Sequence, residues 1–219
     1  VAISAGTGVF NGDTSAVKAK AQASAILEYA NEVKFAVDRL LGKGCTDTQI
    51  SFENPIVSGY VNPNAPSDKS CHVFDVNGGG ISWKSPPAGV TTTPATGYSP
   101  QAYRYSGVHC VGGFGSPMNG YLGGPVAGCR SDASPPQLVM STTDLTPQVC
   151  DALNTLLGEE ILSSGHNNSS GVLSSAPFVG AYNKNAAGAF DAQATIGKMM
   201  GCARVNTAYI YFYSVLIPR

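Results

Sequence analysis

The fold is decided by the stretch TSAVKAKAQASAILEYANEVKFAVDRLL, which covers residues 14–41. Its larger apolar side chains recur every three or four residues, the period of one face of an α-helix. This core face consists of Ile26, Ala30, Val33, Val37 and Leu40. Asp13 or Thr14 can cap the first turn, and Gly42 and Gly44 end the pattern. The stretch therefore predicts one helix over residues 14–42, about 42 Å long.

The first half of this helix has a surface of its own. Residues 16–25 are rich in alanine, the best helix former, and contain no apolar side chain larger than valine. Such a surface allows another backbone to approach closely, but it does not anchor a core by itself.

The rest of the chain alternates short extended runs with turns rich in Gly, Pro, Asn and Ser. Predicted strands cover residues 49–52, 71–76, 80–84 and 137–142, with Asn77-Gly78 as a hairpin turn. Residues 85–136 and 165–188 are expected to be mostly loop.

Two further elements are predicted near the C-terminal end. Thr146 is a suitable cap and Pro147 a suitable first residue for a short helix over residues 147–157. Residues 209–217 place aromatic and β-branched side chains on both faces, which favours a strand covered on both sides. We expect Tyr209, Tyr211 and Tyr213 to pack there rather than to line a ligand-binding face. The predicted fold class is α+β: a long N-terminal helix packed on an antiparallel sheet, with long disulfide-clipped loops and a second short helix.

The six cysteines indicate disulfide bonds. They form no C-x-x-C motif and no zinc-finger spacing with histidine, and their number is even. Disulfides imply an oxidising compartment, whereas six reduced core cysteines are the alternative. The sequence leaves the connectivity open. Nearest-neighbour pairing is our hypothesis: Cys45–Cys71, Cys110–Cys129 and Cys150–Cys202.

Composition limits the classes of partner. The net charge is −1, and only 12% of the residues are charged. A chain with so few charges and a net charge near zero does not favour binding to nucleic acid or to an anionic membrane surface. No run reaches the roughly 18 apolar residues of a membrane helix. We expect residues 1–13 to be an apolar arm or the remnant of a hydrophobic helix. Residues 14–219 are expected to be one domain, with a β-rich region over 45–219.

Motifs for catalysis are missing from the sequence. Gly78-Gly-Gly80 is not followed by the Gly-Lys-Ser/Thr of a phosphate loop, and it fits a turn better. His72, His109 and His166 are isolated from any nucleophile or metal-ligand pattern. We therefore predict no enzymatic activity, no cofactor and no metal.

The order of these features resembles the type IV pilins and pseudopilins. Residues 15–41 are similar to the amphipathic half of a pilin helix, and a β-rich, disulfide-clipped region follows. Under this resemblance Cys150 and Cys202 correspond to the pair that closes the C-terminal region of a pilin. The hydrophobic N-terminal helix by which pilins most resemble one another, with its early glutamate, is not found in this sequence.

The resemblance implies a structural subunit of an extracellular filament, a type IV pilus or a secretion pseudopilus. Its partners would be copies of itself, with membrane insertion through the missing N-terminal helix. The assembly face would comprise Val17, Ala21 and Ala25, and we expect Ala19, Ala21 and Ala23 to be exposed on an isolated domain. The alternatives are a secreted adhesin or carbohydrate-binding module, a viral coat or tail protein, and a secreted hydrolase.

Overall fold

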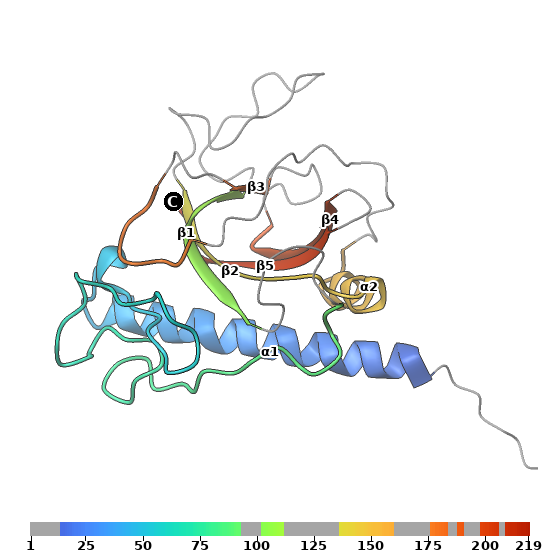
Figure 1. Cartoon of the computed structure of the whole chain (residues 1–219), viewed down its shortest axis with the longest axis horizontal. Coiled ribbons are helices and arrows are strands. Elements are labelled where there is room, and N and C mark those ends of the chain that lie inside the picture. The colour runs from blue at the N-terminus through green and yellow to red at the C-terminus, as the bar shows by residue number, and fades with distance from the viewer. Residues whose placement is uncertain are drawn as a thin grey trace, which may run out of the picture.

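The protein is α+β, with one long helix, one short helix and a sheet (Figure 1). The computed structural model describes residues 14–92, 102–111, 136–159, 176–183, 188–190, 198–205 and 209–219. The expected arm over residues 1–13 lies outside these ranges. The described elements are α1 (Thr14–Gly42), the 3-10 turn η1 (Asp47–Gln49), β1 (Arg104–Val111), β2 (Gln137–Thr143), α2 (Pro147–Leu156), β3 (Gly188–Phe190), β4 (Met200–Val205) and β5 (Tyr209–Ile217).

The sheet has the strand order β3-β1-β2-β5-β4. Neighbouring strands are antiparallel, except that β3 runs parallel to β1. The predicted C-terminal strand is confirmed as β5, which lies between β2 and β4. Its side chains from Ile210 to Ile217 are buried on both faces, which explains its unbroken apolar and aromatic sequence.

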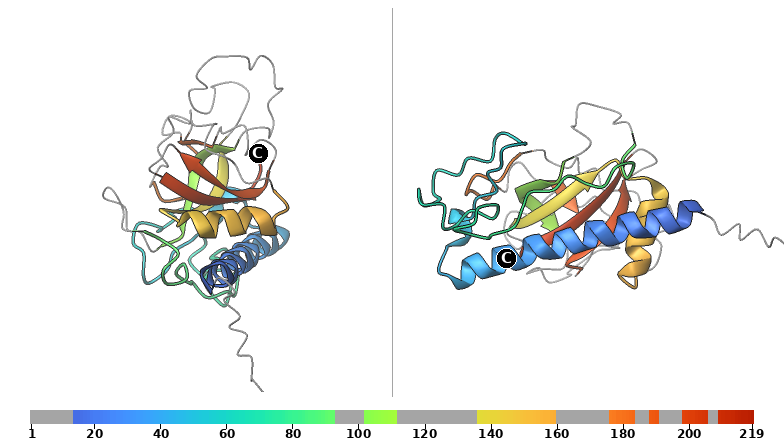
Figure 2. Two further views of the ribbon diagram at one scale, coloured as in Figure 1. Left: turned by 90° about the vertical axis from the view of Figure 1, so that its right-hand side faces the viewer. Right: turned by 90° about the horizontal axis from the view of Figure 1, so that it is seen from below.

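The two helices lie on the same side of the sheet. α1 runs along one face of the sheet, and α2 crosses α1 near its N-terminal half (Figure 2). Both helices contribute buried side chains to one core cluster, together with β1, β2 and β5. Within the described residues, no helix combines the length and the apolarity that a membrane span requires.

Aromatic side chains join α1 to the sheet and to the loop that follows the helix. The ring of Tyr29 lies 4.9 Å from that of Tyr103, and Phe52 stacks on Tyr105 at 4.2 Å. The backbone N–H of Tyr105 donates to the hydroxyl of Tyr60 at 3.0 Å. Burial raises the pKa of all four tyrosines above the ordinary value, so their hydroxyls stay protonated at neutral pH.

The region between α1 and β1 differs from the prediction. Residues 49–52, 71–76 and 80–84 are not strands, and only one isolated bridge joins Ser51 to His72. Asn77-Gly78 is not a hairpin turn but part of a compact loop, in which Gly78 N–H donates to Asp75 O. A Cβ at Gly78 would collide with the backbone of His72. Close backbone packing, rather than a strand ladder, therefore shapes this region.

Of the elements after residue 100, α2 and β2 were predicted from the sequence, whereas β1 and β4 were not. The second helix and the strand over residues 137–142 are confirmed as α2 and β2. Thr146 caps α2, because its hydroxyl accepts a bond from the N–H of Val149. The prediction that residues 85–136 are mostly loop missed β1, and no strand was predicted where β4 lies. Glycine within β1 and β4 hides their extended pattern.

Candidate assembly surface

The inner side of α1 is the predicted core face. Ile26, Ala30, Val33, Val37 and Leu40 all have no solvent exposure. Their spacing places them on one line of the helix, and this line faces the sheet and the loop after α1. The core face therefore fixes which side of α1 points outward.

The outward side carries the predicted assembly positions. Ala21 and Ala25 are exposed, and Val17 is 69% exposed. Thr14 to Lys18 are all exposed, and the N-terminal end of α1 extends past α2 at the edge of the molecule (Figure 1). The three positions thus lie on the free surface of the described part of the chain.

Phe35 extends this outward surface and was not singled out from the sequence. It is 70% exposed and lies 18 residues after Val17, which is five full helical turns. The two side chains therefore lie on one line of the helix, about 27 Å apart. The sequence does carry a signal for it, because Phe35 is a large apolar residue of the helix that lies off the core face. We call the surface formed by Val17, Ala21, Ser24, Ala25, Glu28 and Phe35 the outer ridge.

Ala19 and Ala23 correct the expectation for the first half of the helix. Ala19 is 5% exposed and Ala23 is fully buried, in the same core cluster as Val149 and Leu153 of α2. The expectation failed because it assumed that nothing covers the small side chains of residues 16–25. α2 crosses α1 here, and alanine allows the two helices to approach closely.

Charges are unevenly distributed along α1. Lys18 and Lys20 are exposed near its N-terminal end, and residues 14–27 contain no acidic side chain. Glu28 follows on the outer ridge, and Glu32 forms an ion pair with Lys84 at 2.7 Å. No salt bridge joins Lys18, Lys20 or Glu28 to another residue in the described ranges.

Toward the C-terminal end of α1 there is one ion pair on the helix surface, and Arg39 is exposed beside it. Lys34 and Asp38 form an i,i+4 ion pair on its surface. The exposed basic side chains Lys18 and Lys20 therefore lie at one end of α1 and Arg39 at the other, and the acidic Glu28 lies between them.

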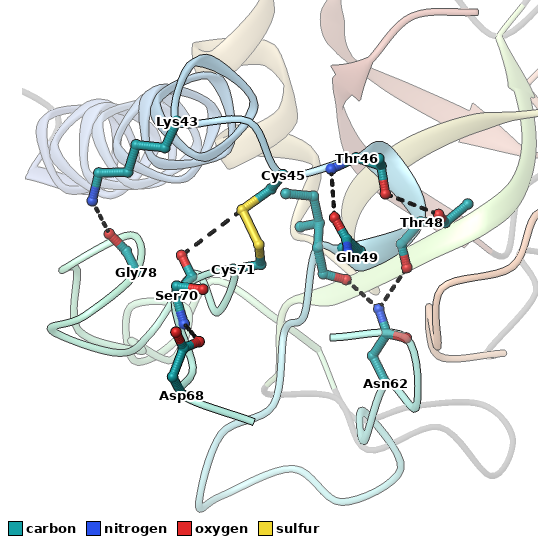
Figure 3. The surroundings of a disulfide bond; sticks show 11 residues. Lys43, Cys45, Thr46, Thr48, Gln49, Asn62, Asp68, Ser70, Cys71 and Gly78 are labelled. Atoms are coloured by element: carbon teal, nitrogen blue, oxygen red, sulfur yellow. Dashed lines mark hydrogen bonds between the residues drawn. A yellow bond between two sulfur atoms is a disulfide. The ribbon is translucent and has the colours of Figure 1, made fainter. Parts of the chain in front are cut away.

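Two of the three hypothesised disulfides are present. Cys45–Cys71 closes the segment after α1 and joins the end of the helix to the loop around residue 78. In Figure 3, the Lys43 ammonium donates to the carbonyl of Gly78 at 3.1 Å beside this bond. The disulfide and the hydrogen bond together fasten the compact loop against the C-terminal end of α1.

The second disulfide fastens α2 to the sheet. Cys150 on α2 is bonded to Cys202 on β4. The Asn154 side chain, one turn further along α2, both accepts from Cys202 N–H and donates to Cys202 O at 2.9 Å. The side chain of Cys110 and all of Cys129 lie outside the described residues, so the third pair is not placed.

His72 and His109, the two histidines within the described residues, are not brought into a common site. His72 is buried in the loop after α1, and burial lowers its pKa despite the nearby Glu53 carboxylate. His109 is buried in β1, and His166 lies outside the described residues. In the ranges that the structure describes, no cluster of three His, Cys, Asp or Glu side chains could hold a metal ion.

The tyrosines of β5 are packing residues where their side chains are described. Tyr211 and Tyr213 are buried in a small cluster with Val139 and Val215 on the sheet face opposite the helices. Burial raises the pKa of Tyr213 above its ordinary value. The side chain of Tyr209 lies outside the described residues.

An open cavity lies beside the start of β1. Its volume is about 320 Å³, and its lining consists of Ile56, Val57, Ser58, Tyr60, Ala102, Arg104 and Pro177. Tyr60 is 4% exposed, and its hydroxyl already accepts the N–H of Tyr105. This lining combines aliphatic walls with one guanidinium, and its single aromatic ring is buried in the core.

Comparison of the chain with protein-family models, with curated proteins and with solved structures gives no match.

Proposed function

We propose that this chain is a structural subunit of an extracellular filament of the type IV pilin or pseudopilin kind, acting by packing and not by catalysis. The observation that carries the proposal is the two-sided character of α1. One side is fully buried under the sheet, and the opposite side exposes Val17 and Phe35 on a single line. A helix line that presents an exposed ring and, further along, small side chains has the ridge and the groove by which one helix packs on another.

Three further features support the proposal. The order of elements, a long N-terminal helix followed by a mainly antiparallel sheet, is the one that the pilin resemblance implies. The N-terminal end of α1 projects from the domain (Figure 1), so a membrane-inserted segment N-terminal to α1 would leave the core undisturbed. The two disulfides suit a protein exposed to an oxidising extracellular environment.

The function is tested on the surface of cells that produce the full-length protein. Gold-labelled antibodies against the domain should mark filaments along their whole length in electron micrographs. The variant Val17→Ser should reduce the number of filaments. Val76→Ser is its matched control, because Val76 is 86% exposed on the compact loop at the opposite end of α1 from Val17. A secreted monomer with no labelled filaments would favour the adhesin alternative instead.

A further inference from the structure

Resting on the filament role proposed above, we propose that the outer ridge contacts a second copy of this chain in parallel orientation. Phe35 of one copy lies beside Ala21, Ser24 and Ala25 of the next. The two helices are then shifted along their common direction by about 12 residues, or about 18 Å.

The side chains of the outer ridge are complementary in size at this shift. Phe35 extends a large ring into solvent, and around residue 23 the outward side chains are Ala21, Ser24 and Ala25. A ring can enter the groove between such small side chains, as ridges of one helix pack into grooves of another. The contact removes apolar area of Phe35 and Val17 from water, which favours association.

The charges beside the ridge select the register. A shift of about 12 residues brings Glu32 of one copy level with Lys20 of the next. The Glu32 carboxylate is 43% exposed, so it can accept from a second ammonium besides that of Lys84. Charges at the edge of an interface contribute mainly to specificity and orientation, which is the role required here.

Two other arrangements bring like charges together. A parallel pair with no shift places Phe35 opposite Phe35 and Glu28 opposite Glu28. An antiparallel pair that seats Phe35 at the same small side chains brings the Glu28 side chains of both copies close together at its centre. The shifted parallel contact avoids both conflicts. It joins two different parts of the surface, so it does not close on itself and can repeat as an open filament.

Cysteine cross-linking in assembled filaments tests the register. Cells producing Phe35→Cys and Ser24→Cys chains together should yield a disulfide-linked dimer on a non-reducing gel, which neither variant yields alone. Thermal unfolding of each variant checks that its domain is intact. Dimers from Phe35→Cys alone would indicate an unshifted pair, whereas dimers from Glu28→Cys without dimers from Phe35→Cys would indicate an antiparallel pair. Either result, or intact filaments with no mixed dimer, overturns the proposed register.

Charge reversal provides a second test that keeps Phe35. Lys20→Glu should reduce the filament yield several-fold, and adding Glu32→Lys in the same chain should restore it. Lys69→Glu, on an exposed loop, is the control and should leave the yield unchanged. Because Glu32→Lys also removes the ion pair with Lys84, thermal unfolding of the double variant is measured as well, and failure of an intact double variant to recover overturns the register. If the unaltered protein forms no filaments at all, the proposed function itself fails, which is a separate result.

Discussion

The substitution of leucine for Ala23 or for Ala21 tests how α1 is covered. The two positions are two residues apart in the same helix, and the added atoms are the same. Ala23 is fully buried against the core cluster that contains residues of α2, whereas Ala21 is exposed. Any difference between the two variants therefore reports on packing and not on helix propensity.

The expected effects follow from this difference in burial. Ala23→Leu forces three extra carbons into a filled space, and such overpacking costs about 1–3 kcal/mol. For a chain of this length, a loss of about 2 kcal/mol lowers the Tm by about 4–8 °C. Ala21→Leu adds its atoms in solvent, and alanine and leucine have similar helix propensities. Its free energy of unfolding should change by less than about 0.5 kcal/mol.

Urea denaturation followed by circular dichroism, with the disulfides intact, measures both values. An unchanged m-value for each variant would show that the comparison reflects stability alone. In cells, Ala21→Leu should still impair filaments, because its side chain occupies the groove proposed for Phe35 of the next copy. Equal destabilisation by both variants would contradict the packing of α2 on α1. Loss of stability in Ala21→Leu but not in Ala23→Leu would show that Ala21, and not Ala23, is the buried position.

Three further outcomes are expected. Replacing Cys150 and Cys202 together by alanine should lower the free energy of unfolding by about 4 kcal/mol, from the loop-entropy relation and a separation of 52 residues; an unchanged urea midpoint would contradict this. Burial lowers the pKa of His72 in the folded state, so its neutral side chain contributes fully to the free energy of unfolding above about pH 6.5. This contribution should fall as the pH drops from there toward the lower folded-state pKa. In His72→Gln, the free energy of unfolding should vary less with pH over this range. The same pH dependence in the variant and the unaltered protein would show that His72 is not responsible for it. Thr146→Ala should cost about 1 kcal/mol through loss of the α2 cap, whereas Thr146→Ser should retain most of it; equal losses in thermal unfolding would show that the hydroxyl has no capping role.

Much of the helical part of the fold was predictable because its signals are local. The extent of α1, its core face and the cap of α2 each depend on residues within a few turns of one another. Helical periodicity and the chemistry of capping residues are therefore enough to predict them. The region after α1 was not predictable in the same way. Its compact loop depends on contacts such as those of Gly78 with the backbone near His72, and no periodic pattern encodes these.

The sequence by itself predicted that a helix with one apolar face precedes the sheet, that the cysteines favour disulfides over a zinc site, and that the last strand is buried on both faces. Helical period and side-chain chemistry suffice for those conclusions. Only the tertiary structure decided that Ala23 is buried in the core that α1 shares with α2, that Ala21 is exposed, and that Phe35 remains in solvent. The period of a helix sets the direction of each side chain. Whether a side chain in that direction is buried depends on which distant element packs there.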